Sequence, residues 1–309
     1  MKKALVILLS ILLVAVAVCG CDRAGMDKPN KGTRVIAGDA VTLEILDRLG
    51  VDVIAVSNDG ASVDEKYADD VKYPKIGIAM SPKYEDISLL NPSEFIMSDA
   101  TEEAFGNIKA SLQGVGVEPM LLDYNSIEGL KASIVRLGDY FDKQDKAQNI
   151  LVELEAKERS IKDKIDAMEN KPRVMILFGA PLGTASDSIS VETNRMFGGS
   201  LITYMGATNV AVEAYESEKR GMFKPNDWDP MIDANPDYIF CIAHGSPEKM
   251  WNMYDGIWDT APYSFMDAVI NGNVYYLPSD VVNVICSFDY VDSMQYILDI
   301  FEGNIEASI

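Results

Sequence analysis

The chain has 309 residues, of which 48% are apolar and 24% charged, so it is long enough for about two globular domains and is not a disordered chain. Acidic residues number 48 against 27 basic ones, and the net charge of −21 argues against a nucleic-acid partner and against attachment to anionic lipid through charge. The single histidine, His244, excludes His-rich zinc sites and any mechanism that needs two imidazoles from one chain.

The N-terminus has the features of a targeting segment. Lys2 and Lys3 precede an apolar run over residues 4–18, which is shorter than the roughly 20 residues of a transmembrane helix. This pattern predicts a secretory signal peptide over residues 1–20, followed by a flexible tether over residues 21–32. An uncleaved anchor helix is the alternative, and both interpretations place the folded part outside the cytoplasm, next to a membrane.

The end of the apolar run resembles the lipobox of bacterial lipoproteins. In that motif, cleavage precedes a cysteine that has Gly or Ala just before it and an aliphatic residue three positions before it. Cys21 matches, with Gly20 and Val18 at those positions. The resemblance implies that Cys21 carries lipid, such as palmitate, and anchors the protein to the cell membrane on its extracytoplasmic side. Cys241 and Cys286 would then remain, either paired or both free.

Short aliphatic runs alternate with helical patterns over the first part of the mature chain. Leu43, Ile45, Leu46 and Leu49 follow the period of an amphipathic helix. Strands are predicted on either side of that helix and further along, at residues 33–37, 51–56, 95–97 and 119–122. Strands separated by helices indicate a mostly parallel sheet, so residues 33–141 are expected to form an N-terminal α/β lobe.

Residues 142–170 differ from their surroundings, because they contain no Gly or Pro and are dense in Glu, Lys, Asp and Ala. Their apolar positions recur at three- and four-residue steps, which predicts one long amphipathic helix. A helix of about 25 residues is roughly 38 Å long and can span two domains. An isolated coiled-coil arm is the alternative, but the sequence offers it no partner helix.

The alternation restarts after this helix and predicts a second α/β lobe over residues 171–309. Its strands are expected at residues 173–178, 209–212, 238–242 and 274–277. The predicted fold class is therefore α/β, with two Rossmann-like lobes bridged by one long rigid helix.

A similar segment occurs once in each lobe. Glu85 lies seven positions before the proline of Asn91-Pro92, and Asp229 lies seven positions before the proline of Asn235-Pro236. Each Asn-Pro pair then leads into a predicted strand. The repetition favours a pseudo-symmetric device that docks on a two-fold partner, and two ordinary helix-to-strand connections are the alternative.

With these segments the chain resembles the substrate-binding lipoproteins of ABC importers for haem, siderophores and cobalamin, in which a single helix joins the lobes. The likeness covers nearly all of residues 33–309 and rests on the motifs at residues 81–92, 197–210 and 235–239. It implies that Glu85 and Asp229 meet arginines of a permease dimer, which works with its ATPase. Asp229 stands where the family usually has Glu, so its contact is shorter.

Within that family the chain is most similar to the haem receptors of iron-regulated surface determinant systems. There, a Met just before a Ser-Pro or Ala-Pro step and a His after a strand of the second lobe bind the haem iron from opposite faces. Met80, before Ser81-Pro82, matches the first, and His244 matches the second. The resemblance implies that haem is the transported ligand and that Met80 and His244 are its axial ligands.

The chemistry of the residues agrees with this. Haem iron accepts imidazole nitrogen and thioether sulfur, and burial of the porphyrin between two lobes would contribute on the order of 12–20 kcal/mol before association costs. Candidate apolar residues for the wall of the haem-binding cleft are Phe223, Met250, Trp251, Met253, Tyr254 and Trp258. Candidate donors to the propionates are Lys83, Arg195, Lys219 and Arg220.

Two other functions remain open. A siderophore or cobalamin receptor would have the same fold, although anionic ferric siderophores favour Arg-rich clefts and the chain has few arginines in its middle part. An extracytoplasmic enzyme or b-type haem electron carrier belongs to another class, but no phosphate-binding loop, nucleophile elbow or zinc-peptidase motif occurs. We therefore expect a monomeric binding protein, not an enzyme.

Overall fold

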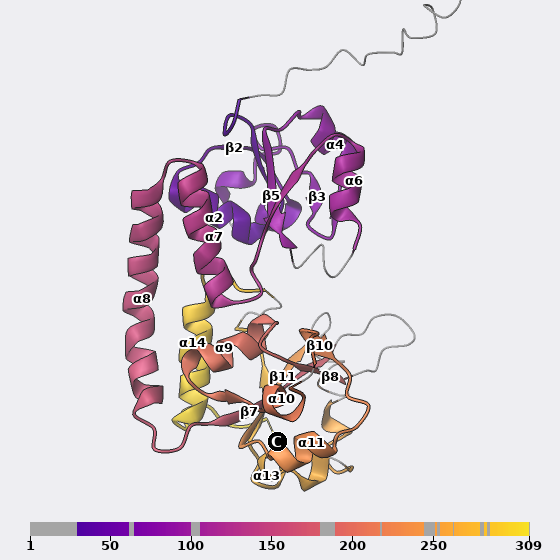
Figure 1. Ribbon diagram of the computed structural model, residues 1–309, viewed down its shortest axis with the longest axis vertical. Coiled ribbons are helices and arrows are strands. Elements are labelled where there is room, and N and C mark those ends of the chain that lie inside the picture. The colour runs from indigo at the N-terminus through magenta and orange to yellow at the C-terminus, as the bar shows by residue number, and fades with distance from the viewer. Residues whose placement is uncertain are drawn as a thin grey trace, which may run out of the picture.

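The computed structural model describes residues 30–61, 65–99, 106–179, 189–216, 218–243, 251, 254–261, 263–278, 281–282 and 285–308. Two α/β lobes lie one beyond the other along the long axis of the molecule, and helices run along one side of both (Figure 1). The predicted signal peptide and Cys21 lie outside the described residues.

The N-terminal lobe is built on a parallel four-stranded sheet in the order β2-β1-β5-β6. Its strands are β1 (Val35–Ala37), β2 (Val53–Val56), β5 (Glu94–Ser98) and β6 (Pro119–Leu122). The helices of this lobe are α2 (Ala40–Leu49), α3 (Asn58–Ala61), α4 (Tyr84–Leu89), α6 (Ile108–Gly114) and α7 (Ile127–Tyr140). All four predicted strands of this lobe are confirmed, and the last matches β6 at both ends.

Alternation along the strands gives this sheet two apolar faces. Val35 and Ala37 pack on the side that α2 and α7 cover, whereas Ile36 joins the core beneath α4 and α6. Asp39 starts α2 by accepting the Thr42 N–H at 2.7 Å, and Gly50 ends it with a left-handed φ of 69°.

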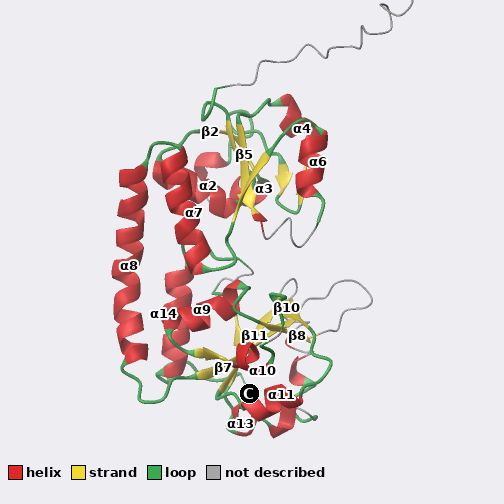
Figure 2. Ribbon diagram, in the orientation of Figure 1, coloured by secondary structure: helices red, strands yellow, loops and turns green. Residues whose placement is uncertain are grey.

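The C-terminal lobe contains a mixed six-stranded sheet in the order β10-β8-β7-β11-β12, and β9 pairs with β7. Its strands are β7 (Arg173–Gly179), β8 (Ile189–Glu192), β9 (Thr208–Asn209), β10 (Met222–Phe223), β11 (Tyr238–Ala243) and β12 (Val274–Leu277). Its helices are α9 (Phe197–Met205), α10 (Val210–Ala214), α11 (Asp229–Ala234), α13 (Asp267–Ile270) and α14 (Tyr290–Phe301). Strands β8 and β10 are antiparallel to their neighbours. Figure 2 shows the strands of both lobes in yellow, with the helices in red around them.

The prediction of a strand at residues 209–212 is wrong. Strand β9 ends at Asn209, and Val210 begins helix α10. The cause is the Asn209 side chain, whose carbonyl oxygen accepts the Ala211 N–H at 3.1 Å and caps the helix. That local bond outweighs the strand preference of the two valines.

Helix α8 (Gln144–Asp166) runs along both lobes and, at 23 residues, is about 35 Å long. It packs against α2 and α7 of the N-terminal lobe and against α9 and α14 of the C-terminal lobe (Figure 1). One hydrophobic cluster consequently runs through both lobes, from Val35 and Leu46 through Leu154 to Phe240 and Leu298. The two lobes therefore share one hydrophobic core and are not two separate domains joined only by a helix.

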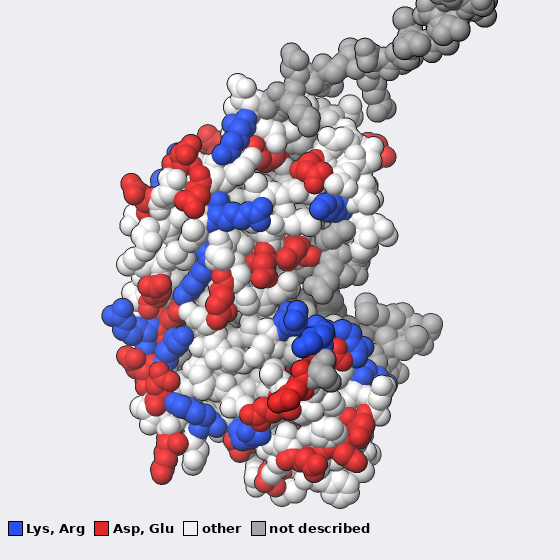
Figure 3. All heavy atoms as spheres, in the orientation of Figure 1, with Lys and Arg blue, Asp and Glu red and all other residues white. Residues whose placement is uncertain are grey.

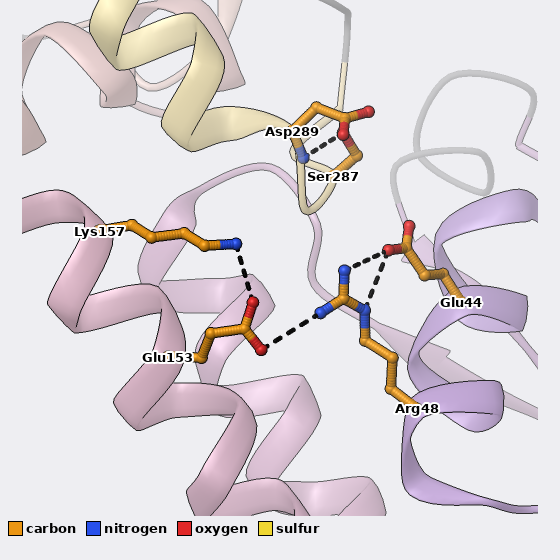
Figure 4. Close-up of polar contacts among 6 residues, drawn as sticks. All are labelled: Glu44, Arg48, Glu153, Lys157, Ser287 and Asp289. Atoms are coloured by element: carbon orange, nitrogen blue, oxygen red, sulfur yellow. Dashed lines mark hydrogen bonds and ion pairs between the residues drawn. The ribbon is translucent and has the colours of Figure 1, made fainter.

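Arg48 adds a contact where three segments meet beside this core (Figure 4). Its guanidinium bonds Glu44 one turn earlier on α2 at 2.9 Å and approaches Glu153 of α8 at 3.9 Å. The same group lies 4.1 Å from the ring centre of Phe288, which precedes α14. These partly exposed ion pairs each contribute little free energy, but they orient the three segments relative to one another.

Candidate functional site

The carboxyl ends of the parallel strands in the two sheets face each other across the junction between the lobes. Tyr124, just after β6, accepts a hydrogen bond at 2.7 Å from the N–H of Cys286, which lies in the segment that follows β12. Ser200, in the first turn of α9, donates to the Asn125 carbonyl at 3.5 Å. In open α/β sheets ligands bind outside the carboxyl ends of the strands, so we call these facing edges the interlobe face.

Met80 occupies the tip of a small hairpin on the N-terminal side of this face. Strands β3 (Gly77–Ile78) and β4 (Ser81–Pro82) pair antiparallel, and Ala79 and Met80 form the turn between them. The Met80 side chain is 47% exposed and the neighbouring Ile78 is 39% exposed. The hairpin thus presents a thioether and an aliphatic side chain outside the core, although most methionines fill cores.

Gly77 is needed for this hairpin. Its φ of 89° lies in the region that only glycine adopts readily, and a Cβ there would lie 2.6 Å from the Ser81 carbonyl oxygen. At the other end of the hairpin, the backbone N–H of Ala79 donates to Asp59 Oδ2 at 2.8 Å. Asp59 could not be singled out from the sequence, because the bond joins elements that are separated along the chain.

On the opposite side of the interlobe face, β11 ends at Ala243, immediately before His244. His244 lies outside the described residues, as do Met250 and Met253. Of the other wall candidates, Phe223, Tyr254 and Trp258 are buried in the core of the C-terminal lobe. Trp251 is half-buried and stacks on Tyr276 with ring centres 4.8 Å apart. These aromatic side chains are therefore packing residues in this structure.

The candidate propionate donors are exposed side chains of both lobes. Arg195 follows β8, while Lys219 and Arg220 precede β10, and Thr193 ties the two segments by donating to the Arg220 carbonyl at 3.0 Å. Arg220 also pairs with Glu218 at 2.6 Å. Lysine and arginine side chains gather at the upper edge of the C-terminal lobe (Figure 3), which is a local exception on an acidic surface.

Glu85 and Asp229 occupy matching places in the two lobes. Each lies exposed in the first turn of a six-residue helix, α4 or α11. Asn91 and Asn235, which follow these helices, both adopt the left-handed φ of 43° and precede the proline that leads into the next strand. The repetition that the sequence indicated is therefore a repeated backbone shape, with an exposed carboxylate at the same point in each copy.

Glu192 is a buried carboxyl group that the sequence did not indicate. It ends β8, is 2% exposed, and its Oε2 atom has no hydrogen-bond partner among the residues that the structure describes. Burial raises the pKa of Glu192 to about 7, although the Gly199 N–H at the start of α9 donates to the carboxylate and lowers the pKa in part. A Cβ on Gly198 would lie 2.5 Å from that Oε2 atom and 2.9 Å from the Ile242 side chain, so the carboxyl is enclosed between α9 and β11.

The described residues offer little support for other kinds of site. They contain no group of three or more His, Cys, Asp or Glu side chains that could hold a metal ion. Within the same part of the chain, no helix has the length and apolar character to cross a membrane. Cys241 and Cys286 are free, buried thiols whose pKa values burial raises, and they belong to different apolar clusters.

Comparison with known proteins agrees with this architecture. A family profile described as periplasmic binding protein matches residues 35–281. The chain is 23% identical over 302 residues to the high-affinity heme uptake system protein IsdE of Staphylococcus aureus, and the match covers 95% of this chain and 96% of that protein.

Solved structures show the same fold. An ABC transporter substrate-binding protein from Listeria monocytogenes superposes with a TM-score of 0.75 at 25% identity, covering 86% of this chain and 97% of its own. S. aureus IsdE complexed with heme superposes with a TM-score of 0.74 at 23% identity, and the match covers 87% of this chain and 98% of that chain. S. aureus SirA complexed with staphyloferrin B superposes with a TM-score of 0.66 at 15% identity, and the match covers 90% of this chain and 94% of that chain.

Proposed function

Because the chain belongs to the periplasmic binding protein family, we propose that it is the substrate-binding protein of an ABC importer that binds haem through Met80 and His244 and delivers it to a permease. The family consists of extracytoplasmic binding proteins, so the chain is not an enzyme. Its relatives include a heme uptake protein and a protein complexed with staphyloferrin B, and haem and ferric siderophores both contain iron.

The observation that carries the proposal is the exposed thioether on the interlobe face. Met80 is 47% exposed at a hairpin tip, although methionine side chains usually fill cores. The single histidine of the sequence directly follows β11, whose carboxyl end belongs to the opposite side of the same face. Sulfur from one lobe and imidazole from the other is the ligand set of six-coordinate haem with a raised potential.

Haem chemistry assigns different tasks to these groups. Apolar burial of the porphyrin supplies most of the affinity, on the order of 12–20 kcal/mol before association costs. The axial pair then supplies orientation and the preference for an iron centre. Ile78, exposed beside Met80, is an apolar surface for the ring edge.

A hemin titration of the purified mature protein tests this assignment. The wild type is expected to give a low-spin, six-coordinate spectrum, which His244→Ala and Met80→Leu each convert to a spectrum with one axial ligand missing, while haem still binds through apolar burial. Met168→Leu is the matched control, because Met168 lies partly buried just after the end of α8 and an exchange of Met for Leu nearly conserves volume. A wild-type spectrum retained in His244→Ala would show that the histidine is not a ligand.

An iron siderophore is the second candidate, and the exposed cations of the C-terminal lobe favour it. Arg195, Lys219 and Arg220 lie on adjoining segments and could pair with an anionic chelate. Binding of a ferric siderophore without binding of hemin in the same titration would select this cargo over haem.

Delivery is proposed to depend on Glu85 and Asp229, which would meet arginines of a permease dimer. In cells that depend on haem as their iron source, Glu85→Arg/Asp229→Arg is expected to lower uptake by about tenfold or more, because each change replaces an ion pair by a like-charge contact. Haem binding by the purified variant is expected to be unchanged. Glu155→Arg on the exposed side of α8 is the control, and equal uptake by the docking variant and this control would contradict the proposal.

We also propose that Cys21 carries a lipid anchor on the extracytoplasmic side of the cell membrane. The lipobox-like sequence before Cys21 supports this, and the predicted tether would let the lobes reach a permease in the same membrane. Gly32, at the end of the predicted tether, is held to the N-terminal lobe instead, because its N–H donates to Glu94 Oε2 at 2.9 Å.

A further inference from the structure

The hairpin that carries Met80 is held at its tip by a side chain from another element. The N–H of Ala79, the residue just before Met80, donates to Asp59 Oδ2 at 2.8 Å across a sequence separation of 20 residues. Asp59 lies in α3, which begins just after β2 ends at Val56. The bond therefore fastens the turn to the carboxyl edge of the N-terminal sheet.

The hairpin cannot fix its own tip. It has only two residues in each strand, and Pro82 has no N–H to give to the ladder. An isolated two-stranded hairpin is marginally stable at best. Its base is fixed by backbone bonds, from Lys83 N to the Ile76 carbonyl at 2.8 Å and from Ile76 N to the Val56 carbonyl at 3.1 Å, but these lie at the end away from Met80.

We propose that Asp59 is a positioning residue that sets the direction in which the hairpin presents the Met80 thioether. This inference rests on the proposed role of Met80 as an iron ligand. A ligand atom must be held close to its productive place by supporting groups, and a turn free to move would be ordered only at a cost to binding. A carboxylate that accepts a backbone N–H makes a charge-assisted bond, which is stronger than a neutral one.

The first test uses the ligand-free protein and does not involve haem. Amide hydrogen exchange at Ala79 is expected to accelerate on the order of tenfold or more in Asp59→Ala, since the bond to the carboxylate is lost. Asp59→Asn keeps an acceptor oxygen and is expected to restore most of the protection. Asp52→Ala removes an exposed aspartate before β2 and is expected to leave the rate unchanged. An unchanged Ala79 rate in Asp59→Ala would overturn the inference.

The second test measures the thioether-to-iron charge-transfer absorption after ferric haem is added. Asp59→Ala is expected to show a weaker band and about tenfold lower haem affinity, with recovery in Asp59→Asn. A wild-type protein without the band contradicts the proposed function itself. The band present in the wild type and equally strong in Asp59→Ala contradicts only the role of Asp59.

Discussion

Replacement of Glu158 by alanine is expected to lower the free energy of unfolding by about 3–5 kcal/mol, because it removes one partner of a buried ion pair. The Glu158 carboxylate is 4% exposed in the middle of α8 and lies 2.8 Å from Lys131 Nζ of α7. Tyr204 of α9 donates to it at 2.6 Å, and Tyr290 of α14 donates to its other oxygen. Without the carboxylate, a lysine that is 17% exposed and two hydroxyl groups lose their shared acceptor.

Chemical denaturation followed by circular dichroism measures this change. Glu153→Ala is the matched control, since Glu153 lies on the same helix but is 51% exposed in its pair with Lys157, and its loss is expected to cost about 0–1 kcal/mol. The double variant Lys131→Met/Glu158→Gln removes both charges and is expected to recover part of the loss. Equal destabilisation by Glu158→Ala and Glu153→Ala would show that the contacts of Glu158 with Lys131, Tyr204 and Tyr290 do not stabilise the fold.

Replacement of Glu192 by glutamine is expected to change the pH dependence of stability. The native pKa of about 7 exceeds the ordinary 4.5, so between these values the native state binds more protons than the unfolded state. The free energy of unfolding therefore falls as the pH rises from 4.5 to 7, by about 3 kcal/mol for this group. The neutral amide does not titrate, so the stability of Glu192→Gln relative to wild type is expected to improve by about 3 kcal/mol between pH 4 and pH 8.

Urea unfolding at a series of pH values measures this difference. Because the comparison is between two pH values, the fixed cost of placing an amide in the same site cancels. Glu306→Gln, which changes an exposed carboxylate near the C-terminus, is the control and is expected to give an offset that does not vary with pH. A constant offset for Glu192→Gln as well would mean that Glu192 titrates near its ordinary value in the folded protein.

The regular part of the fold could be predicted from the sequence because periodicity and burial coincide there. The strands at residues 119–122 and 274–277 match β6 and β12, and in each strand the apolar side chains alternate between two hydrophobic clusters. Where a side chain bonds the backbone locally, periodicity fails, as it does at Asn209. Strands β8 and β10 were missed because they are short and pair antiparallel with residues far along the chain.

Candidate site residues could be singled out from the sequence only where a segment repeats or where a residue type is scarce. Glu85 and Asp229 became candidates because the same spacing occurs twice, and His244 because the chain has one histidine. Asp59 and Glu192 gave no such signal, since the chain has 48 acidic residues and these two differ only in their three-dimensional surroundings.

The aromatic cluster of the C-terminal lobe determines which part of the protein tryptophan fluorescence can monitor. Trp228, Trp251 and Trp258 are the three tryptophans of the sequence, and Tyr263 joins the rings of Trp228 and Trp258 at centre distances of 5.0 and 5.9 Å. The N-terminal lobe contains tyrosine but no tryptophan. Tryptophan fluorescence therefore originates in the C-terminal lobe alone. Quenching of this fluorescence by a bound cargo would report binding near the lobe whose sequence contains His244. The hairpin that carries Met80 has no tryptophan to report on it.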